Sequence, residues 1–352
     1  MPLVGTAGHV DHGKSTLIER LTGRDPDRWD EEKERGLTID LGFAWTSLPS
    51  GTEVSFVDVP GHERFIKNML AGIDGFDVAL LVVAADEGWS VQTTEHVAAL
   101  DALGVSNAVV ALTKIDLADD DMVQLAELEV EEQLTGTSVA GSPIVPVSAI
   151  TGDGIERLLT ALDQAVDGVA DRPGAADLWV DRVFNIAGAG TVVTGSLTQG
   201  TIAVGDELEL LPAGVRVIVR GLHQHDTEVA AVEASGRVAI NVSGLDRREI
   251  SRGHRLRTPG TALATERLFG QIQPAPGGEA PGERGAYHLH LGSGSWSVEL
   301  RPVGAGAAVL VSTNPIPAVA GDRFVLRDVG RQQVVGGGIV LDPSPPARRR
   351  DL

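Results

Sequence analysis

The fold is decided near the start of the chain by Gly8-His9-Val10-Asp11-His12-Gly13-Lys14-Ser15 (GHVDHGKS). This stretch fits the pattern G-x-x-x-x-G-K-[ST], and it follows the apolar run Leu3–Ala7 and opens the amphipathic segment Ser15–Leu21. We therefore expect a strand, a glycine-rich turn and a helix. Such a turn curls backbone N–H groups around phosphate, Lys14 can reach the β and γ oxygens, and the Ser15 hydroxyl can bind Mg²⁺.

Three further short motifs follow, each at the predicted end of a strand. In Asp58-Val59-Pro60-Gly61-His62, the first carboxylate can hold Mg²⁺ through water and the Gly61 N–H can meet a γ-phosphate. In Thr113-Lys114-Ile115-Asp116, the last carboxylate can accept two hydrogen bonds from guanine N1 and N2, a pattern that adenine does not offer. After the next strand, a backbone N–H of Ser148-Ala149 can meet guanine O6. The four motifs in this order predict a GTPase.

The sequence thus predicts a site for GTP or GDP with Mg²⁺. The expected phosphate-binding residues are Asp11, His12, Gly13, Lys14, Ser15, Thr16 and Gly61. The expected guanine-binding residues are Thr113, Lys114, Asp116, Ser148 and Ala149.

The first half of the chain alternates apolar runs with helical patterns. The expected strands are Val54–Val57, Val78–Ala85, Ala108–Leu112 and Ile144–Val147, and the expected helices are Thr93–Leu103, Asp119–Leu134 and Gly154–Val166. This alternation predicts an α/β domain with a mostly parallel sheet covered on both faces.

The pattern changes near Asp171-Arg172-Pro173-Gly174, and short β-rich runs separated by turn residues follow. Their spacing is typical of a small antiparallel barrel. A second break lies near Thr258-Pro259-Gly260, before another β-rich stretch. We predict domains over 1–172, 175–258 and 262–345, with 346–352 as a tail or linker.

Composition limits the class of protein. The chain has no Cys, which excludes disulfides, Cys-ligated zinc and thiol catalysis. The N-terminus does not resemble a signal peptide, and no apolar run approaches the roughly 20 residues that span a bilayer. These features predict a cytoplasmic protein with no membrane partner.

Charge is unevenly spread along the chain. The net charge of −20 falls on the first half, because acidic and basic residues are equal in number over 173–352. A polyanion such as tRNA would be repelled by the first half and would need local arginines. We expect part of one cluster to face tRNA phosphate: Arg247, Arg248, Arg252, Arg255 and Arg257.

Four segments carry a family resemblance to translational GTPases of the elongation factor Tu type. They are Ala7–Thr16 (AGHVDHGKST), Arg35–Ile39 (RGLTI), Asp58–Glu63 (DVPGHE) and Gly188–Gly195 (GAGTVVTG). The resemblance extends through nearly the whole chain. It implies a GTPase domain followed by two antiparallel β-barrels.

Details within that group are similar to the selenocysteine-specific elongation factors. The segment Thr38–Phe43 reads TIDLGF, and the stretch Thr22–Arg35 is shorter than its counterpart in elongation factor Tu. Thr113 replaces the usual Asn of N-K-x-D, a change that this family tolerates. That Asn normally ties the base loop to the phosphate loop, so the change bears on nucleotide affinity and leaves guanine specificity in place.

The resemblance also implies roles for single residues. His62 would be the catalytic residue that orients the attacking water, with Val10 and Leu37 as an apolar gate over it. The ribosome would stimulate this hydrolysis, which depends on positioning and charge stabilisation. The implied Mg²⁺ ligands are Ser15, Thr38 and, through water, Asp58.

An aminoacyl pocket is implied at the start of the first barrel. Asp181, Arg182 and Arg237 resemble the family's selenocysteine pocket, with both arginines facing selenium and the carboxylate orienting the group. A selenolate is ionised at neutral pH, so a selective pocket needs positive charge where a hydroxyl gains little. From the residues alone, the more usual interpretation of these side chains is surface ion pairs of a barrel.

The implied function is GTP-dependent delivery of selenocysteinyl-tRNA to the ribosome at recoded UGA codons, by a monomer. One alternative is a general aminoacyl-tRNA or initiator-tRNA carrier of the elongation factor Tu type. Another is a GTP-regulated protein with no tRNA partner. Bacterial members of the resembled family continue into winged-helix modules that bind an mRNA hairpin, and we expect this sequence, which ends at Leu352, to lack that region.

Overall fold

The computed structural model describes residues 1–26, 38, 40–62, 65–73, 75–188, 190–225, 227–234, 236–283 and 285–346. These residues divide into two compact units, Met1–Ala170 and Asp171–Leu352. Within the described residues, no helix has the length and apolar character needed to cross a membrane.

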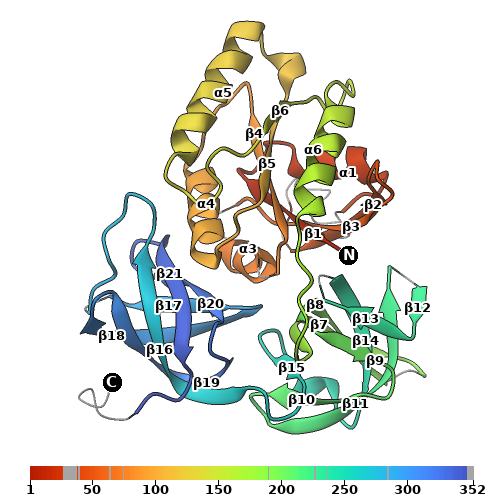
Figure 1. Ribbon diagram of the computed structural model, residues 1–352, viewed down its shortest axis with the longest axis vertical. Helices are drawn as coiled ribbons and strands as arrows, with labels where there is room; N and C mark the ends of the chain where they lie inside the picture. The colour runs from red at the N-terminus through yellow and green to blue at the C-terminus, as the bar shows by residue number, and fades with distance from the viewer. Residues whose placement is uncertain are drawn as a thin grey trace. The chain divides into compact units, whose positions relative to one another are not determined.

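The first unit is built on a six-stranded sheet in the order β2-β3-β1-β4-β5-β6 (Figure 1). Its strands are β1 (Leu3–Gly8), β2 (Gly42–Ser47), β3 (Glu53–Asp58), β4 (Val78–Ala84), β5 (Ala108–Thr113) and β6 (Ile144–Pro146). Only β2 runs antiparallel to its neighbour, so the predicted mostly parallel sheet is confirmed. Every residue of β1, β4 and β5 is buried, as expected of strands covered on both faces.

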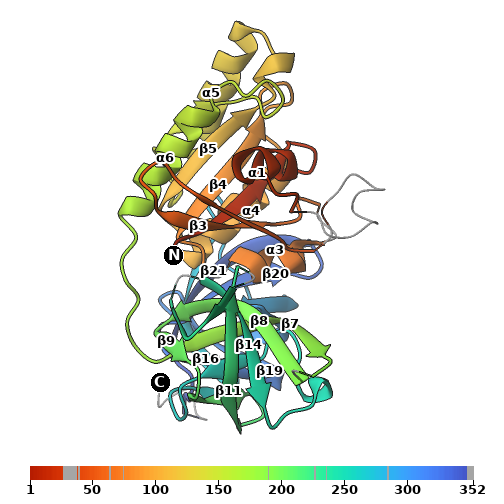
Figure 2. The same cartoon turned by 90° about the vertical axis from the view of Figure 1, so that its right-hand side faces the viewer.

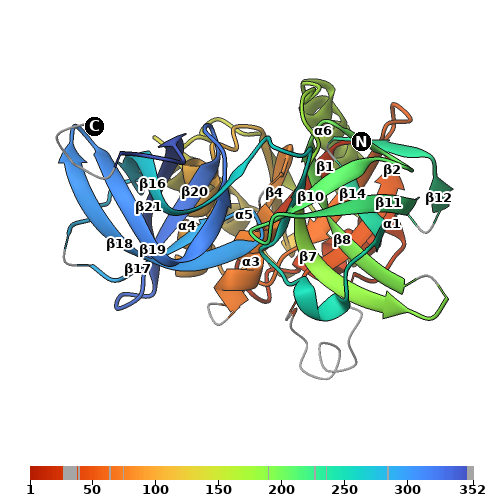
Figure 3. The same ribbon diagram turned by 90° about the horizontal axis from the view of Figure 1, so that it is seen from below.

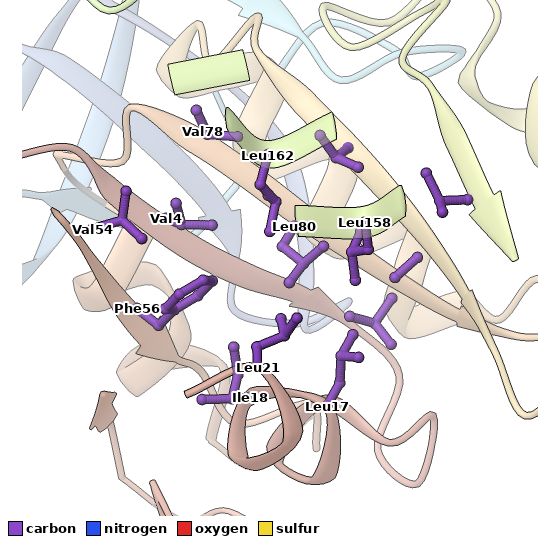
Figure 4. Packing of buried hydrophobic residues seen from close by; sticks show 14 of the residues in the cluster. Val4, Leu17, Ile18, Leu21, Val54, Phe56, Val78, Leu80, Leu158 and Leu162 are labelled. Atoms are coloured by element: carbon purple, nitrogen blue, oxygen red, sulfur yellow. The ribbon is translucent and has the colours of Figure 1, made fainter. Parts of the chain in front are cut away.

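Helices cover both faces of this sheet. They are α1 (Lys14–Thr22), α3 (Ile66–Ile73), α4 (Val91–Leu103), α5 (Asp120–Leu134), α6 (Ile155–Asp167) and the 3₁₀ turn η2 (Ile115–Leu117). On one face, α1 and α6 bring Leu17, Ile18, Leu158 and Leu162 into a single apolar core with the strands (Figure 4). Figure 1 shows α4 and α5 on the opposite face.

The second unit begins with an antiparallel barrel. Its ring consists of β7 (Asp177–Ile186), β8 (Gly190–Gln199), β14 (Gly236–Ser243), β11 (Val215–Gln224), β10 (Glu207–Leu211) and β15 (Arg255–Arg257). Pairing of β10 with both β11 and β15 closes the ring. Figure 2 shows β7, β8, β14 and β11 side by side. Short additions are β9 (Thr201–Ala203), β12 (Thr227–Val229), β13 (Ala231–Glu233) and the 3₁₀ turn η3 (Arg247–Glu249).

A second closed antiparallel barrel follows (Figure 3). Its strands are β16 (Leu263–Pro274), β17 (Tyr287–Leu291), β18 (Gly294–Gly304), β19 (Ala307–Ala318), β20 (Arg323–Asp328) and β21 (Gln333–Asp342). The predicted architecture, a P-loop α/β domain followed by two antiparallel barrels, is therefore confirmed.

A buried arginine joins the two barrels. The Arg255 guanidinium donates to both carboxylate oxygens of Asp177 on β7, at 2.6 and 2.5 Å, and to both of Asp322 before β20, at 2.6 and 2.9 Å. It also lies 4.6 Å from the ring centroid of Trp179. Burial disfavours its charge, but hydrogen bonds and attraction from the two carboxylates outweigh burial and raise the pKa of Arg255 above its ordinary value.

Candidate nucleotide and aminoacyl sites

The phosphate loop joins β1 to α1 and has the backbone conformation that exposes N–H groups. Gly8, Asp11 and Gly13 all have positive φ, at 132°, 65° and 83°. Gly13 is the N-cap of α1. Because glycine has no side chain, this residue cannot cap the first N–H groups of the helix. The N–H groups of the first helical turn and the positive end of the helix dipole together favour a phosphate.

Lys14 and Gly61 lie against each other at this loop. The buried Lys14 ammonium donates to the carbonyls of Gly8 and His9, at 3.1 and 2.5 Å. A Cβ built on Gly61 would lie 2.4 Å from the Lys14 Nζ and 2.6 Å from the Val10 nitrogen. Only glycine fits this close approach, so two motifs far apart in the sequence meet here.

The three residues expected to hold Mg²⁺ come together. The Ser15 hydroxyl lies 2.9 Å from that of Thr38 and donates to Asp58 Oδ2 at 2.6 Å. The other oxygen of Asp58 accepts from Thr6, at 2.7 Å, whose hydroxyl in turn accepts the Val59 N–H at 3.0 Å. Two hydroxyls and a carboxylate are hard oxygen donors that fit Mg²⁺. Thr6, which orients the carboxylate, was not predicted as a site residue.

Thr113 connects the base loop to the phosphate loop. Its buried hydroxyl donates to the His12 carbonyl of the phosphate loop at 2.7 Å, and lies 3.2 Å from the Val83 carbonyl. Since a hydroxyl carries one hydrogen, the shorter contact is the better hydrogen bond. The tie between base loop and phosphate loop is therefore kept with Thr in place of Asn.

The rest of the base loop leaves a carboxylate available. Lys114 has φ 59°, and its ammonium donates to Glu87 at 2.7 Å. Burial opposes the charge of Lys114, but this hydrogen bond and the nearby Asp86 raise the pKa of Lys114. The hydrogen bond from Lys114 likewise lowers the pKa of Glu87. Asp116 is exposed, with its carboxylate accessible to a base.

The loop after β6 is held by its own hydrogen bonds. The N–H of the fully buried Ser148 donates to the Asp153 carbonyl at 2.9 Å, and its hydroxyl accepts the Thr151 N–H at 3.1 Å. Because the Ser148 N–H is engaged, Ala149 is the better candidate of this pair to meet guanine O6.

The expected hydrolytic residues are described in part. His62 is half-buried, with its ring centroid 6.0 Å from that of Phe65. Val10 is half-buried beside Gly61. Leu37, expected to complete the apolar gate, lies outside the described residues. The catalytic role of His62 and the gate stay predictions.

The residues expected around an aminoacyl group also meet, on the first barrel. Arg237 of β14 forms a two-pronged ion pair with Asp181 of β7, at 2.6 and 3.0 Å. Thr194 of β8 lies between them, donating to Asp181 at 2.6 Å and accepting from Arg237 at 2.9 Å. A register shift between Val180 and Arg182 interrupts the pairing of β7 with β8 at Asp181. Such an irregularity re-aims side chains, and it puts Asp181 and Arg182 together opposite Thr194.

The second arginine of this group, Arg182, is half-buried and is the direct partner of Thr194 across the β7–β8 pair. Sequence reasoning missed Thr194, which lies near the end of the Gly188–Gly195 segment and contacts Asp181 and Arg237. The roles of Asp181, Arg182 and Arg237 toward an amino acid stay predictions.

The predicted arginine cluster divides into two kinds of residue. Arg255 and Arg257 are buried, with 1% and 6% of their surface exposed, so neither can belong to the part that faces a phosphate backbone. Arg247 and Arg248 are exposed on η3 and keep the role as a prediction.

Sequence profiles of known families match three parts of the chain. The elongation factor Tu GTP-binding domain matches residues 1–167, and elongation factor Tu domain 2 matches residues 190–256. The β-barrel domain of the selenocysteine-specific elongation factor matches residues 282–347.

Relatives and solved structures agree with these profiles. A selenocysteine-specific elongation factor of Desulfomicrobium baculatum is 40% identical over 99% of this chain and 57% of its own length. Elongation factor Tu 2 of Streptomyces avermitilis is 33% identical over 96% of this chain and 95% of its own length. The crystal structure of a bacterial selenocysteine-specific elongation factor superimposes with a TM-score of 0.94 at 33% identity, covering 99% of this chain and 60% of that one.

The chain spans a little over half the length of the selenocysteine-specific relatives that it matches. Its nearly full-length match to an elongation factor Tu shows the wider family, and the second-barrel profile marks the branch. The chain belongs to the elongation factor Tu family of translational GTPases, in the branch of the selenocysteine-specific elongation factors.

Proposed function

We propose that this chain binds GTP with Mg²⁺ and in that state holds selenocysteinyl-tRNA for delivery to the ribosome at recoded UGA codons. The observation that carries the proposal is the arrangement on the first barrel. There Thr194 contacts the Asp181–Arg237 ion pair and pairs across the strands with Arg182. This grouping of two arginines with one carboxylate supports a small cationic site on a barrel of this family.

The nucleotide half of the proposal rests on the phosphate loop and the oxygen cluster beside it. Lys14, now bonded to loop carbonyls, can turn to phosphate oxygens, and Gly61 lies beside it to offer an N–H to a γ-phosphate. Ser15, Thr38 and Asp58 would hold Mg²⁺, which when bound neutralises charge on the β- and γ-phosphates. Asp116 and Ala149 would read guanine.

Hydrolysis in this proposal needs the ribosome. His62 would orient the attacking water when the ribosome positions its ring, whose centroid lies 6.0 Å from that of Phe65. The chemistry is positioning and electrostatic stabilisation, with no covalent intermediate.

Selectivity for selenocysteine follows from charge. The selenol is ionised at neutral pH, whereas the serine hydroxyl is neutral, so a guanidinium favours the first by a charge-assisted contact. The carboxylate of Asp181 accepts two hydrogen bonds from the Arg237 guanidinium and so holds it in one orientation. Arg182 lies across from the same Thr194, so both guanidinium groups can approach one anionic atom.

A general aminoacyl-tRNA carrier is the second candidate, favoured by the match over 95% of an elongation factor Tu. The two candidates differ in preference among amino acids. A general carrier would protect seryl- and selenocysteinyl-tRNA about equally, and a GTP-regulated protein without a tRNA partner would protect neither.

The test is a GTP-dependent protection assay that compares selenocysteinyl-, cysteinyl- and seryl-tRNA, with Arg182→Ala and Arg237→Ala beside the parent. We expect the parent to protect the selenocysteinyl ester most strongly. Each substitution should lower that preference about tenfold, as loss of a charge-assisted contact implies, with GTP affinity unchanged. Equal protection of all three esters by the parent would reject the proposal.

A further inference from the structure

Two histidines and a glutamate form a cluster whose side chains have no part in the proposed nucleotide chemistry. His9 and His12 belong to the phosphate loop after β1, and Glu87 follows β4. Since β1 and β4 are adjacent and parallel, the segments after both strands lie at one edge of the sheet. One donor atom from each side chain lies within 4.8 Å of the other two.

The spacing is too wide for direct hydrogen bonds and suits a shared ion. His12 Nε2 lies 3.7 Å from Glu87 Oε2, beyond hydrogen-bond range. The two imidazole rings meet edge to face, with centroids 4.9 Å apart and planes at 71°. Zinc bonds of about 2.0–2.2 Å in tetrahedral geometry put donor atoms roughly 3.3 Å apart, so small side-chain rotations would complete the site.

Buried nitrogen atoms supply an independent argument. The His12 side chain is 1% exposed, and the backbone of Val82 is a nearby hydrogen-bonding group, in a geometry that leaves both ring nitrogens without a well-formed hydrogen bond among the described residues. His9 Nδ1 is in the same condition. Buried polar atoms in proteins are almost always satisfied, and those that are not call for a missing water or ion.

The carboxylate of Glu87 keeps one oxygen for a metal ion. Lys114 donates to the other oxygen at 2.7 Å. Glu87 thus keeps Oε2 for a ligand.

We propose that His9, His12 and Glu87 bind a first-row transition metal ion of the Zn²⁺ type, at a site distinct from the Mg²⁺ ligands. Two imidazoles and one carboxylate match zinc sites that keep a fourth position open, and they are poor ligands for Mg²⁺, which prefers oxygen. None of the three is shared with the Ser15, Thr38 and Asp58 group. The site goes beyond the proposed function, because tRNA delivery does not require it.

The test is a zinc titration of the nucleotide-free full chain in millimolar Mg²⁺, read by competition with a chromophoric chelator. We expect one equivalent of zinc to bind tightly. His9→Ala and Glu87→Gln should each weaken that affinity by about tenfold or more, the scale seen when metal-site groups are removed. Cobalt bound at the site should show the intense visible absorption of tetrahedral coordination in the parent and lose it in both variants.

Two controls separate the site from general effects of charge. Asp86→Asn removes a carboxylate one residue from Glu87 that lies 3.7 Å from the same Lys114, and His223→Ala removes an exposed histidine of the first barrel. Both should bind zinc like the parent. Should His9→Ala fail to fold, by circular dichroism, the partly exposed Glu87 decides the question alone. Zinc affinity unchanged in Glu87→Gln, or no stoichiometric uptake by the parent, would overturn the proposal.

Discussion

At the scale of single residues, short hydrogen bonds from hydroxyl groups shape the nucleotide site. Thr6 orients Asp58, Ser15 links Asp58 to Thr38, and Thr113 ties the base loop to the phosphate loop. Each hydroxyl is compact, so it holds two segments close without filling the space of a nucleotide. Thr113 therefore does the work of the Asn that is usual in this motif, through one hydrogen bond at 2.7 Å.

The first prediction concerns a substitution of Thr113 that removes this hydrogen bond and keeps the shape of the side chain. Thr113→Val should weaken GTP and GDP binding equally, by about five- to tenfold, because losing one buried hydrogen bond costs about 1–1.5 kcal/mol. Nucleotide titrations by fluorescence check this. Thr137→Val, which removes a similar bond to the Leu134 carbonyl in α5's C-terminal turn region, should leave both affinities unchanged. Affinities within twofold of the parent in Thr113→Val would show that the tie is unimportant.

At the scale of elements, α4 supports the phosphate loop from the sheet face opposite α1. Its buried His96 accepts the Gly8 N–H through Nδ1 at 2.9 Å. Burial, followed by repulsion from Lys14 and His9, lowers the pKa of His96 to about 3. A proton on that nitrogen would face the Gly8 N–H and break the contact between helix and loop.

The second prediction concerns pH. The pKa of His96 is depressed in the folded chain, so below the ordinary histidine pKa of 6.5 the unfolded chain binds a proton that the folded chain does not. Above pH 7 the His96 side chain has no effect on the pH dependence of stability. As the pH drops from 6.5 toward 3, the depressed pKa lowers the free energy of unfolding by about 1.4 kcal/mol per pH unit. His12, with a pKa of about 4, adds the same slope down to that pH.

Urea unfolding followed at 222 nm between pH 7 and 5 checks this, since the α-helices of the described residues all belong to the first unit. His96→Asn keeps an acceptor for the Gly8 N–H but cannot titrate. In this variant, the slope of the free energy of unfolding against pH should be about half of the slope that His96 and His12 together produce in the parent. A slope equal to that of the parent would contradict the assignment.

Sequence patterns predicted the elements whose burial is uniform and missed those defined by distant partners. Continuous apolar runs identified β4 and β5, which are buried on both faces. Strand β2 reads GFAWTS, is only partly buried and exists through its pairing with β3, and α3 is a short helix of eight residues. Neither has a period that stands out from the neighbouring loops.

The candidate site shows the same division. Residues within contiguous motifs, such as Lys14 and Asp58, could be predicted because the chemistry is written in adjacent positions. Thr6, Thr194 and Glu87 could not, because each acquires its role from a partner that only folding brings near. Thr6 is 52 residues from Asp58, and Thr194 is 43 from Arg237.

At the scale of the whole molecule, the second unit carries two barrels joined by one arginine. Arg255 holds carboxylates from both barrels and contacts Trp179, while Ser293 of the second barrel donates to the Val180 carbonyl of the first at 2.6 Å. A buried ion pair that loses one partner leaves an uncompensated charge, which is strongly destabilising. The barrels are thus expected to unfold as one cooperative body.

The third prediction tests that coupling. Arg255→Met keeps apolar volume but leaves the buried Asp177 without its main partner, and should lower the free energy of unfolding by about 3–5 kcal/mol. Urea unfolding followed by tryptophan fluorescence measures the loss, since Trp179 and Trp296 lie at this junction, 6.4 Å apart.

The matched control is Arg216→Met, which breaks an ion pair with Glu207 whose side chains are 62% and 44% exposed. It should cost less than about 1 kcal/mol, as exposed pairs do. A similar small loss in Arg255→Met would mean that the arginine does not hold the barrels together.

The central claim is that the nucleotide, sensed through Lys14, Thr38 and Gly61, decides whether the barrels can bind a charged tRNA. The most direct measurement is the dissociation constant of selenocysteinyl-tRNA for the full chain with a non-hydrolysable GTP analogue and with GDP. We predict at least a hundredfold tighter binding with the triphosphate, about 2.7 kcal/mol of coupling. Equal affinity in the two nucleotide states would contradict the account.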